Sequence, residues 1–281
     1  MKFGIRSAVD VVFKTTRAYT GTKNDFLLQE GQEWAKGEPV LYFDSLKMAT
    51  TEGTAETVYA QGGKGNPRLI AWEGDKTVTF TFEDALISIE GLSVLAGADL
   101  LAAGDGTSIR VHKKIVAQAG ANGVVNVAEA VEDVETVVSS EAFGFVVNAE
   151  GDIIKRLGAG VVAEKEITFS EEEVTQGDSV LVDFYVTRAS KVQEISITPD
   201  KFAGYFYIEG DTLFRRQSDG KDLAAQIAIP NAKIQTAFTF EMSPSGDPST
   251  FTFTADAFPG VLAGDPVGAE KKMYAMRILE D

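Results

Sequence analysis

The sequence predicts an all-β fold, mainly antiparallel, with one or two short helices. The strongest observation is a pair of alternating stretches, Ile234 to Met242 and Ser249 to Ala257, on either side of the turn Ser243 to Pro248. In the second stretch Phe251 and Phe253 fall on one face, with Thr between them. Period-two alternation is typical of half-buried antiparallel strands. Short β-rich runs separated by Gly and acidic residues fill much of the remaining chain.

Length and composition exclude several classes of protein. The 281 residues suit one large all-β domain or two of ordinary size. The chain has no cysteine, which removes disulfides, thiolate metal sites and cysteine nucleophiles. A formal charge of -16 repels a nucleic-acid backbone and argues against ordinary DNA or RNA binding. That acidity either keeps the protein soluble or forms a wall past which a polyanion slides without sticking.

Nothing in the sequence predicts a membrane location. No stretch reaches the roughly 20 apolar residues that cross a bilayer. The start, Met1 to Arg6, lacks an apolar signal core and a small-residue cleavage site. We therefore expect the chain to be made in the cytoplasm.

The first elements are a strand at Val9 to Lys14 and a polar, glycine-bearing stretch from Thr15 to Glu38. Large apolar residues interrupt that stretch: Phe26, Leu27, Leu28 and Trp34. Such groups on a long loop mark a contact surface or pack back onto the parent domain. Both interpretations are open from the residues alone.

The next elements are extended. One strand is predicted at Val40 to Met48 and a second after Thr50 to Gly53, running through Tyr59. The turn cluster Gly62 to Pro67 follows.

A hairpin is predicted next, from Arg68 to Glu73 and from Thr77 to Glu83 across a Gly-Asp turn. The apolar spacing of Leu92 to Leu101 then favours a short helix closed by Gly104.

An inserted, small β-rich lobe is predicted over residues 108–163, between the two parts of a β core, 1–107 and 164–281. Its strands are the Val-rich runs Ile109 to Val116, Gly123 to Val127 and Phe143 to Val147.

The final third again shows β-branched and aromatic alternation. Strands are predicted at Ile167 to Ser170, Ser179 to Arg188, Val192 to Thr198 and Gly204 to Arg215. The apolar register changes at Pro230-Asn231, which predicts a bulge or a strand break there.

No catalytic, cofactor-binding or metal-ligating residues are predicted. The cluster Gly62 to Pro67 has the glycines and lysine of a phosphate loop, but it lacks a Gly-Lys-Ser/Thr ending and leads into a strand. His112 is the only histidine, so a histidine pair for a metal is impossible. Carboxylates are abundant, yet nothing singles out two of them as an acid–base pair.

One group of aromatic residues has two interpretations. A sugar-stacking platform is one, and packing between strands is the default. The residues are Tyr205, Phe206, Tyr207 and Phe214.

Four ordered segments resemble those of tailed-bacteriophage structural proteins, most of all the tail tube proteins of contractile-tailed phages. They are Gly62 to Trp72, Asp75 to Ser88, Ile229 to Gln235 and Gly246 to Phe251. The similarity covers about residues 40–100 and 178–258, and the middle lobe has no counterpart in it.

The resemblance implies a β-sandwich or barrel-like subunit without enzymatic activity. Copies would form homohexameric rings that stack into a conduit for DNA ejection, with sheets merging between neighbours so that no edge is exposed. DNA would pass an acidic lumen without specific binding. The implied partners are further copies of the chain and the tail sheath, tape measure and baseplate proteins, in a virion made in a bacterial host.

In that setting the stretch Thr15 to Glu38 would reach the next ring, with Phe26, Leu27, Leu28 and Trp34 as contacts. Two other functions are weighed against this one. The first is another virion component, a head decoration or baseplate protein, which would not form tubes of uniform diameter. The second is a carbohydrate-binding module or β-rich hydrolase, which would bind saccharides or lose turnover when a carboxylate pair is neutralised.

Overall fold

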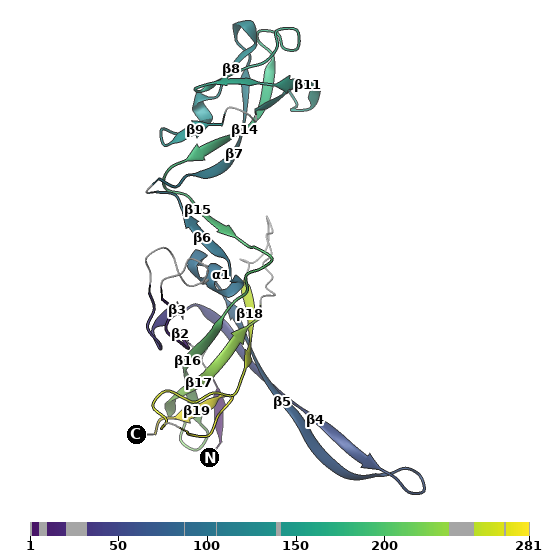
Figure 1. Cartoon of the computed structure of the whole chain (residues 1–281), viewed down its shortest axis with the longest axis vertical. Helices are drawn as coiled ribbons and strands as arrows, with labels where there is room; N and C mark the ends of the chain where they lie inside the picture. Colours follow the sequence, from purple (N-terminus) through teal and green to yellow (C-terminus); the bar gives the residue numbers. More distant parts are fainter. Residues whose placement is uncertain are drawn as a thin grey trace. The chain divides into compact units, whose positions relative to one another are not determined.

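The computed structural model describes residues 2–5, 10–20, 33–86, 88–104, 106–138, 142–235, 250–266 and 268–280. The chain divides into two compact units, whose residues can be located in Figure 1 by the sequence colours of its bar. Unit 1 comprises Met1–Leu100 and Ile195–Asp281, and unit 2 comprises Leu101–Glu194. Unit 2 continues past residue 163, where the sequence predicted the lobe to end, because a later strand pairs inside it.

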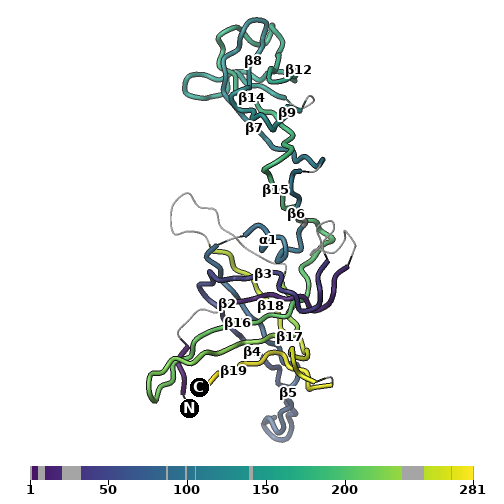
Figure 2. The backbone as a smooth tube through the Cα atoms, turned by 90° about the vertical axis from the view of Figure 1, so that its left-hand side faces the viewer, coloured from purple at the N-terminus to yellow at the C-terminus, as the bar shows by residue number. Residues whose placement is uncertain are grey.

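Unit 1 is built on an antiparallel sheet in which nine of the described strands take part. Its order is β3-β2-β16-β17-β18-β5-β4, with β1 added to β16 and β19 added to β17. Figure 2 shows β2, β16 and β17 as neighbours. The strands are β1 (Phe3–Ile5), β2 (Asp10–Thr15), β3 (Pro39–Phe43), β4 (Leu46–Gln61), β5 (Arg68–Asp84), β16 (Tyr205–Arg216), β17 (Asp222–Ile234), β18 (Phe251–Ala257) and β19 (Ala275–Ile278). The all-β, antiparallel prediction is confirmed.

The sheet curls into an open barrel. Its two edge strands, β3 and β4, follow each other in the chain, and only Asp44 and Ser45 lie between them. An extended chain spans about 3.3–3.6 Å per residue, so Phe43 and Leu46 lie at most about 11 Å apart. Because the ends of the two edges are tied together in this way, the sheet must bend round, and its inner face becomes the core.

Aromatic rings fill the barrel. The ring of Phe13, which is fully buried, has neighbouring ring centroids from β3, β5, β16 and β18. The motif Thr-Phe-Thr-Phe occurs within β5 and again at the start of β18, whose first residue is the Phe after the leading Thr. The two strands are hydrogen-bonded neighbours, with Phe82 opposite Phe253. Both strands therefore present phenylalanines to one core.

Two predicted elements change in unit 1, and one predicted bulge is confirmed. The stretch Val40 to Met48 is divided between β3 and β4. β5 runs straight through Gly74-Asp75, so the hairpin predicted across that dipeptide is wrong. The register there moves from Ala55 opposite Lys76 to Thr57 opposite Glu73, and Gly74-Asp75 form a bulge instead of a turn. At Pro230-Asn231 the predicted bulge is confirmed, because the pairing of β16 with β17 shifts register there.

The helix α1 (Ile89–Ala96) lies earlier than the predicted Leu92 to Leu101. Ser88 begins it, accepting a hydrogen bond from the Gly91 N–H at 2.9 Å. Gly97 ends it with φ of 65°, a left-handed conformation that glycine adopts readily. Strand β6 (Asp99–Ala102) follows. In the residues that the structure describes, no helix is long and apolar enough to cross a membrane.

Replacing Gly97 by alanine is expected to lower the free energy of unfolding by about 2 kcal/mol or more. A Cβ atom at Gly97 would lie 2.3 Å from the carbonyl carbon of Phe202 and 2.6 Å from the amide nitrogen of Ala203, and backbone atoms cannot swing away. Gly220 is a matched control, since its φ is 69° but a Cβ there meets nothing within 4 Å. Urea denaturation of both variants checks the difference, and equal losses would contradict the crowding at Gly97.

Unit 2 holds a five-stranded and a three-stranded antiparallel sheet among its described residues. β14 lies between β10 and β7, with β9 also on β14, and β13 lies between β12 and β8. The elements are β7 (Ile109–Gln118), two 3₁₀ turns (Ala121–Gly123 and Ala128–Ala130), β8 (Val124–Asn126), β9 (Glu135–Val137), β10 (Phe143–Val147), β11 (Ile153–Ala159), β12 (Val161–Ala163), β13 (Glu166–Thr168) and β14 (Ser179–Arg188). β6 pairs with β15 (Gln193–Ser196) where the chain passes between the units. The core of unit 2 includes Val125, Ile167 and Phe184.

Candidate assembly surfaces

The outer halves of β4 and β5 form an extended hairpin, residues 54–77, which we call the arm. In Figure 1 it reaches beyond the other strands of unit 1. Its strands pair from Thr54 opposite Thr77 to Gln61 opposite Arg68. The turn between them is made by residues 62–67, where two glycines and Asn66 have positive φ. The arm is therefore about eight residue pairs long, or roughly 25 Å at 3.3 Å per residue.

One face of the arm carries an apolar stripe. Val58 lies opposite Trp72, and Ala60 lies opposite Ile70, so these four side chains share a face. Val58, Ile70 and Trp72 are 54, 55 and 54% exposed. Exposed apolar groups gathered on one surface mark an interaction site. Within the described residues, nothing buries this stripe.

The other face of the arm is more polar. It carries Thr57, Tyr59, Ala71 and Glu73, and the guanidinium of Arg68 lies 4.0 Å from the centre of the Tyr59 ring. Stacking of a cation on an aromatic ring is attractive and orders the side chain of Arg68.

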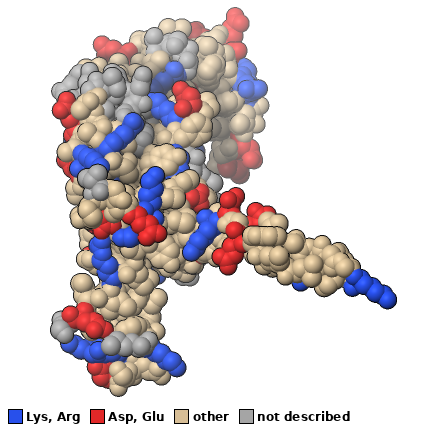
Figure 3. All heavy atoms as spheres, turned by 60° about the horizontal axis from the view of Figure 1, so that its bottom comes forward, with Lys and Arg blue, Asp and Glu red and all other residues tan. Residues whose placement is uncertain are grey.

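Charge is separated along the arm. Lys64 and Arg68 lie at its tip, whereas carboxylates gather near its root and Lys76 is the cation among them. The root carboxylates are Glu56, Glu73 and Asp75 within the arm and Glu52 two residues before it, all exposed. Figure 3 shows positive side chains at the free end of the arm and negative ones where it joins the barrel. The arm thus has a positive tip and a negative root.

An apolar cavity of about 270 Å³ opens at the end of the barrel from which the arm leaves. Among the described residues, its walls come from seven strands and include no charged side chain. Ile5 and Met276 line it and are 69 and 46% exposed, so they form the rim of its mouth. Deeper in, it is lined by Val11, Phe80, Phe82, Ile208, Phe214 and Ile229. We call the opening the barrel mouth.

The ring contacts predicted from the sequence are described only in part. Phe26, Leu27 and Leu28 lie outside the described residues. Trp34 is half-buried against the core of unit 1. Its backbone exchanges hydrogen bonds with Tyr19, at 2.9 and 3.0 Å. Trp34 therefore packs on its own unit in the isolated chain.

Other residues singled out in the sequence have ordinary surroundings. His112 lies on the surface of β7, and its Nε2 is 2.9 Å from a carboxylate oxygen of Asp183. Of the four aromatic residues considered for sugar stacking, Phe206 and Phe214 are buried in unit 1, and the hydroxyl of the buried Tyr207 accepts a hydrogen bond from the Ala263 N–H. Tyr205 is exposed beside Phe258. Among the described residues, no group of three or more side chains is placed to hold a metal ion.

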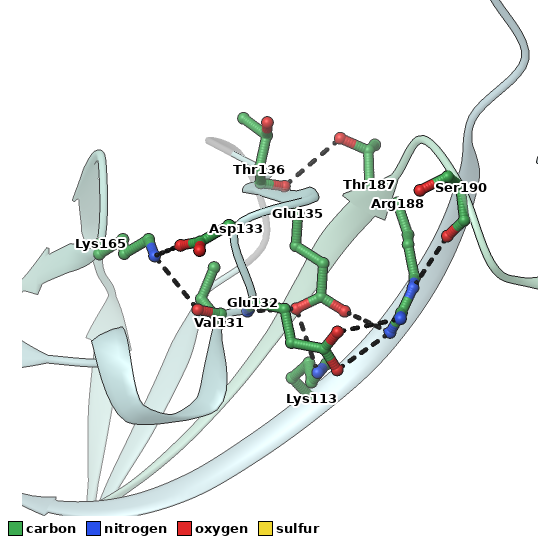
Figure 4. Close-up of polar contacts among 10 residues, drawn as sticks. All are labelled: Lys113, Val131, Glu132, Asp133, Glu135, Thr136, Lys165, Thr187, Arg188 and Ser190. Atoms are coloured by element: carbon green, nitrogen blue, oxygen red, sulfur yellow. Dashed lines mark hydrogen bonds and ion pairs between the residues drawn. The ribbon is translucent and has the colours of Figure 1, made fainter. Parts of the chain in front are cut away.

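Unit 2 contains a carboxylate, that of Glu135, which is buried and paired with two cations, as Figure 4 shows. The side chain of Glu135 is fully buried, and its oxygens lie 3.1 Å from Lys113 Nζ and 3.1 Å from Arg188. It also accepts a hydrogen bond from the Glu132 N–H at 2.9 Å. Burial by itself raises the pKa of Glu135, but that hydrogen bond and the two cations outweigh it, and the net pKa is lowered. Arg188 also forms an ion pair with Glu132 and donates a hydrogen bond to its carboxylate.

The sequence predicted the strands and the turn of the arm, through Tyr59, Gly62 to Pro67 and Arg68 to Glu73, but not its exposure as a projecting surface. Its strands expose both faces, so they show no alternation, and their apolar residues come as the run Leu69-Ile70-Ala71-Trp72. A run of that kind beside a glycine-rich turn was the available signal.

A family comparison decides what kind of protein carries this arm. A model of the YomU/Tube protein family matches residues 32–266. The chain belongs to this family. It is a phage tube-like protein, as the resemblance of the four segments implied. No curated protein matches the chain.

The YomU/Tube match includes the arm, the α1 helix and all of unit 2, so these parts lie inside the family's span.

Proposed function

We propose that this chain is the tail tube subunit of a contractile-tailed phage. Copies close into hexameric rings, and the rings stack into the conduit through which DNA is ejected. The observation that carries the proposal is the arm: a hydrogen-bonded hairpin that presents Val58, Ile70 and Trp72 to solvent in a tube-family chain. An isolated subunit gains nothing from exposing them, whereas burial stabilises an assembly by about 1.5–3 kcal/mol for each side chain.

The overall charge suits a conduit. With -16 on each copy, a wall of such subunits repels the phosphate backbone, and DNA passes without adhering. In this role the protein works as a structural element and performs no catalysis. Its partners are further copies and the sheath, tape measure and baseplate proteins of the same virion.

Electron microscopy of the concentrated, purified chain tests the proposal. We expect hollow tubes of uniform diameter with six-fold rings. Globular particles or isolated rings would favour a head decoration or baseplate component instead. A sharply defined monomer at every concentration would overturn the proposal.

A variant in which Val58, Ile70 and Trp72 are all replaced by threonine is expected to remain folded but lose assembly. Threonine suits strands, and exposed substitutions change stability by only about 0.5 kcal/mol each. The assembly loses the burial of three apolar groups, so the protein concentration needed for polymer rises at least about a hundredfold. Sedimentation of polymer at increasing protein concentration measures the shift.

A matched control replaces exposed apolar residues of unit 2 in the same way. Ile153, Ile154 and Val161 are 57, 65 and 70% exposed. With these three changed to threonine, tubes should form as in the native chain. Equal loss in both variants would show that general surface apolarity, and not the arm, drives assembly.

A further inference from the structure

We propose that the arm of one copy docks head to tail on unit 1 of a second copy. The positive tip meets the negative root of the second copy's arm, and the apolar stripe covers its barrel mouth. This inference rests on the proposed function and adds to it the partner surface that receives the arm.

The first argument is that two apolar surfaces lie uncovered among the described residues of unit 1. The barrel mouth opens on a cavity of about 270 Å³, and the described residues that line it carry no charge. A cavity of about 150 Å³ already accommodates benzene, so this volume is enough for a side chain such as that of Ile70 or Trp72. Joining the stripe to the mouth removes both from water at once.

The stripe cannot cover the mouth of its own chain. Ile70 and Phe80 lie on the same strand, β5, and Phe80 lines the cavity. Ten residues of strand separate them, which is about 33 Å at 3.3 Å per residue. The stripe that we propose for the mouth therefore comes from another copy.

The second argument is electrostatic. Lys64 and Arg68 give the tip a charge of the opposite sign to the root, where four carboxylates outnumber Lys76. Two tips repel each other, and so do two roots, whereas a tip and a root attract each other. The charges thus specify the direction in which one arm approaches the next copy.

Symmetry distinguishes this contact from a pairing of two arms. Two arms lying antiparallel would also match tip with root, but such a two-fold contact is complete with two copies and leaves both barrel mouths open. A contact between an arm and a mouth joins different surfaces and repeats from copy to copy, which is what a closed ring requires.

Cysteine cross-linking tests the contact directly. The native chain has no cysteine, so every disulfide must join introduced cysteines. Chains with Ile70→Cys are mixed with chains with Met276→Cys, assembled, and oxidised mildly. A disulfide needs Cα atoms about 4.4–6.8 Å apart, so only docked copies react. The matched control is Ala71→Cys, the next residue along the arm but on its opposite face.

We expect a disulfide-linked dimer from the Ile70→Cys mixture, several-fold more abundant than from the Ala71→Cys mixture. Tubes that form with no such difference, or with Ile70→Cys chains linked mainly to each other, overturn the docking mode and leave the proposed function standing. Failure of the unsubstituted chain to form any polymer overturns the proposed function, and this inference with it.

A charge reversal tests the direction. One variant carries Lys64→Glu and Arg68→Glu, and the other carries Glu56→Lys and Glu73→Lys. Each alone places like charges on tip and root, so at low salt we expect each to lose pelletable polymer. In a mixture, the negative tip of the first variant meets the positive root of the second, and the positive tip of the second meets the negative root of the first. Polymer should therefore return, with the two variants alternating. Native-like assembly of either variant alone would overturn the charge pairing.

Discussion

Replacing Phe13 by alanine is expected to lower the free energy of unfolding of unit 1 by about 3–5 kcal/mol, the usual cost of a large cavity in a core. The Phe13 ring is fully buried, and its centroid lies 5.4 Å from that of Phe43, 5.7 Å from that of Phe206 and 5.9 Å from that of Phe253. These rings belong to three different strands, so no single strand can move inward to fill the space. The cavity remains, and its walls lose their contacts.

Tryptophan fluorescence during urea denaturation measures this loss. Both tryptophans of the chain, Trp34 and Trp72, lie in unit 1, so the signal reports that unit alone. The midpoint should fall while the dependence on urea concentration stays the same. Tyr42→Ala is the matched control, since Tyr42 is an aromatic of β3 that is 62% exposed. A change for Phe13→Ala within about 0.5 kcal/mol, as for a surface site, would contradict the central place of this ring.

Where one face of a strand is buried, its sequence alone was sufficient to place it. β14 was predicted with its observed bounds, Ser179 to Arg188, because Val180, Val182, Phe184 and Val186 are fully buried and alternate with more exposed residues. The pairing of β14 was not predictable in the same way. Its partners, β7 and β10, are distant in the sequence, and this pairing carries unit 2 beyond the predicted end at residue 163.

Local turn signals were less reliable where a long-range partner competes. Gly74-Asp75 suits a turn by composition, yet Ala55 and Thr57 on β4 hold the flanking residues in a ladder, and the dipeptide becomes a bulge. Gly97 ended the helix earlier than Gly104 would have, because the left-handed conformation is adopted at Gly97. The arm had no alternation to detect, since neither of its faces is buried in the isolated chain.

Replacing Glu135 by glutamine is expected to destabilise unit 2 by about 2–3 kcal/mol. Glutamine keeps the shape of the side chain, but it removes the charge that Lys113 and Arg188 share. Both cations are mostly buried, at 22 and 17% side-chain exposure, so water restores only part of their solvation. Glu129 is an exposed glutamate of the same unit, and Glu129→Gln should change little.

The pH dependence gives Glu135 a signature that a merely bulky or polar role would lack. Its pKa is lowered in the folded protein, so the carboxylate contributes its stability fully above the ordinary value of 4.5. That contribution disappears as the pH falls through the lowered pKa of the folded protein, because Glu135 is then protonated in both the folded and the unfolded chain. Unit 2 of the native chain should therefore lose stability on acidification below pH 4.5, and Glu135→Gln should lose correspondingly less. Calorimetric unfolding between neutral and acidic pH measures the difference in stability between the two proteins. A difference that stays constant with pH would exclude the charged network as its cause.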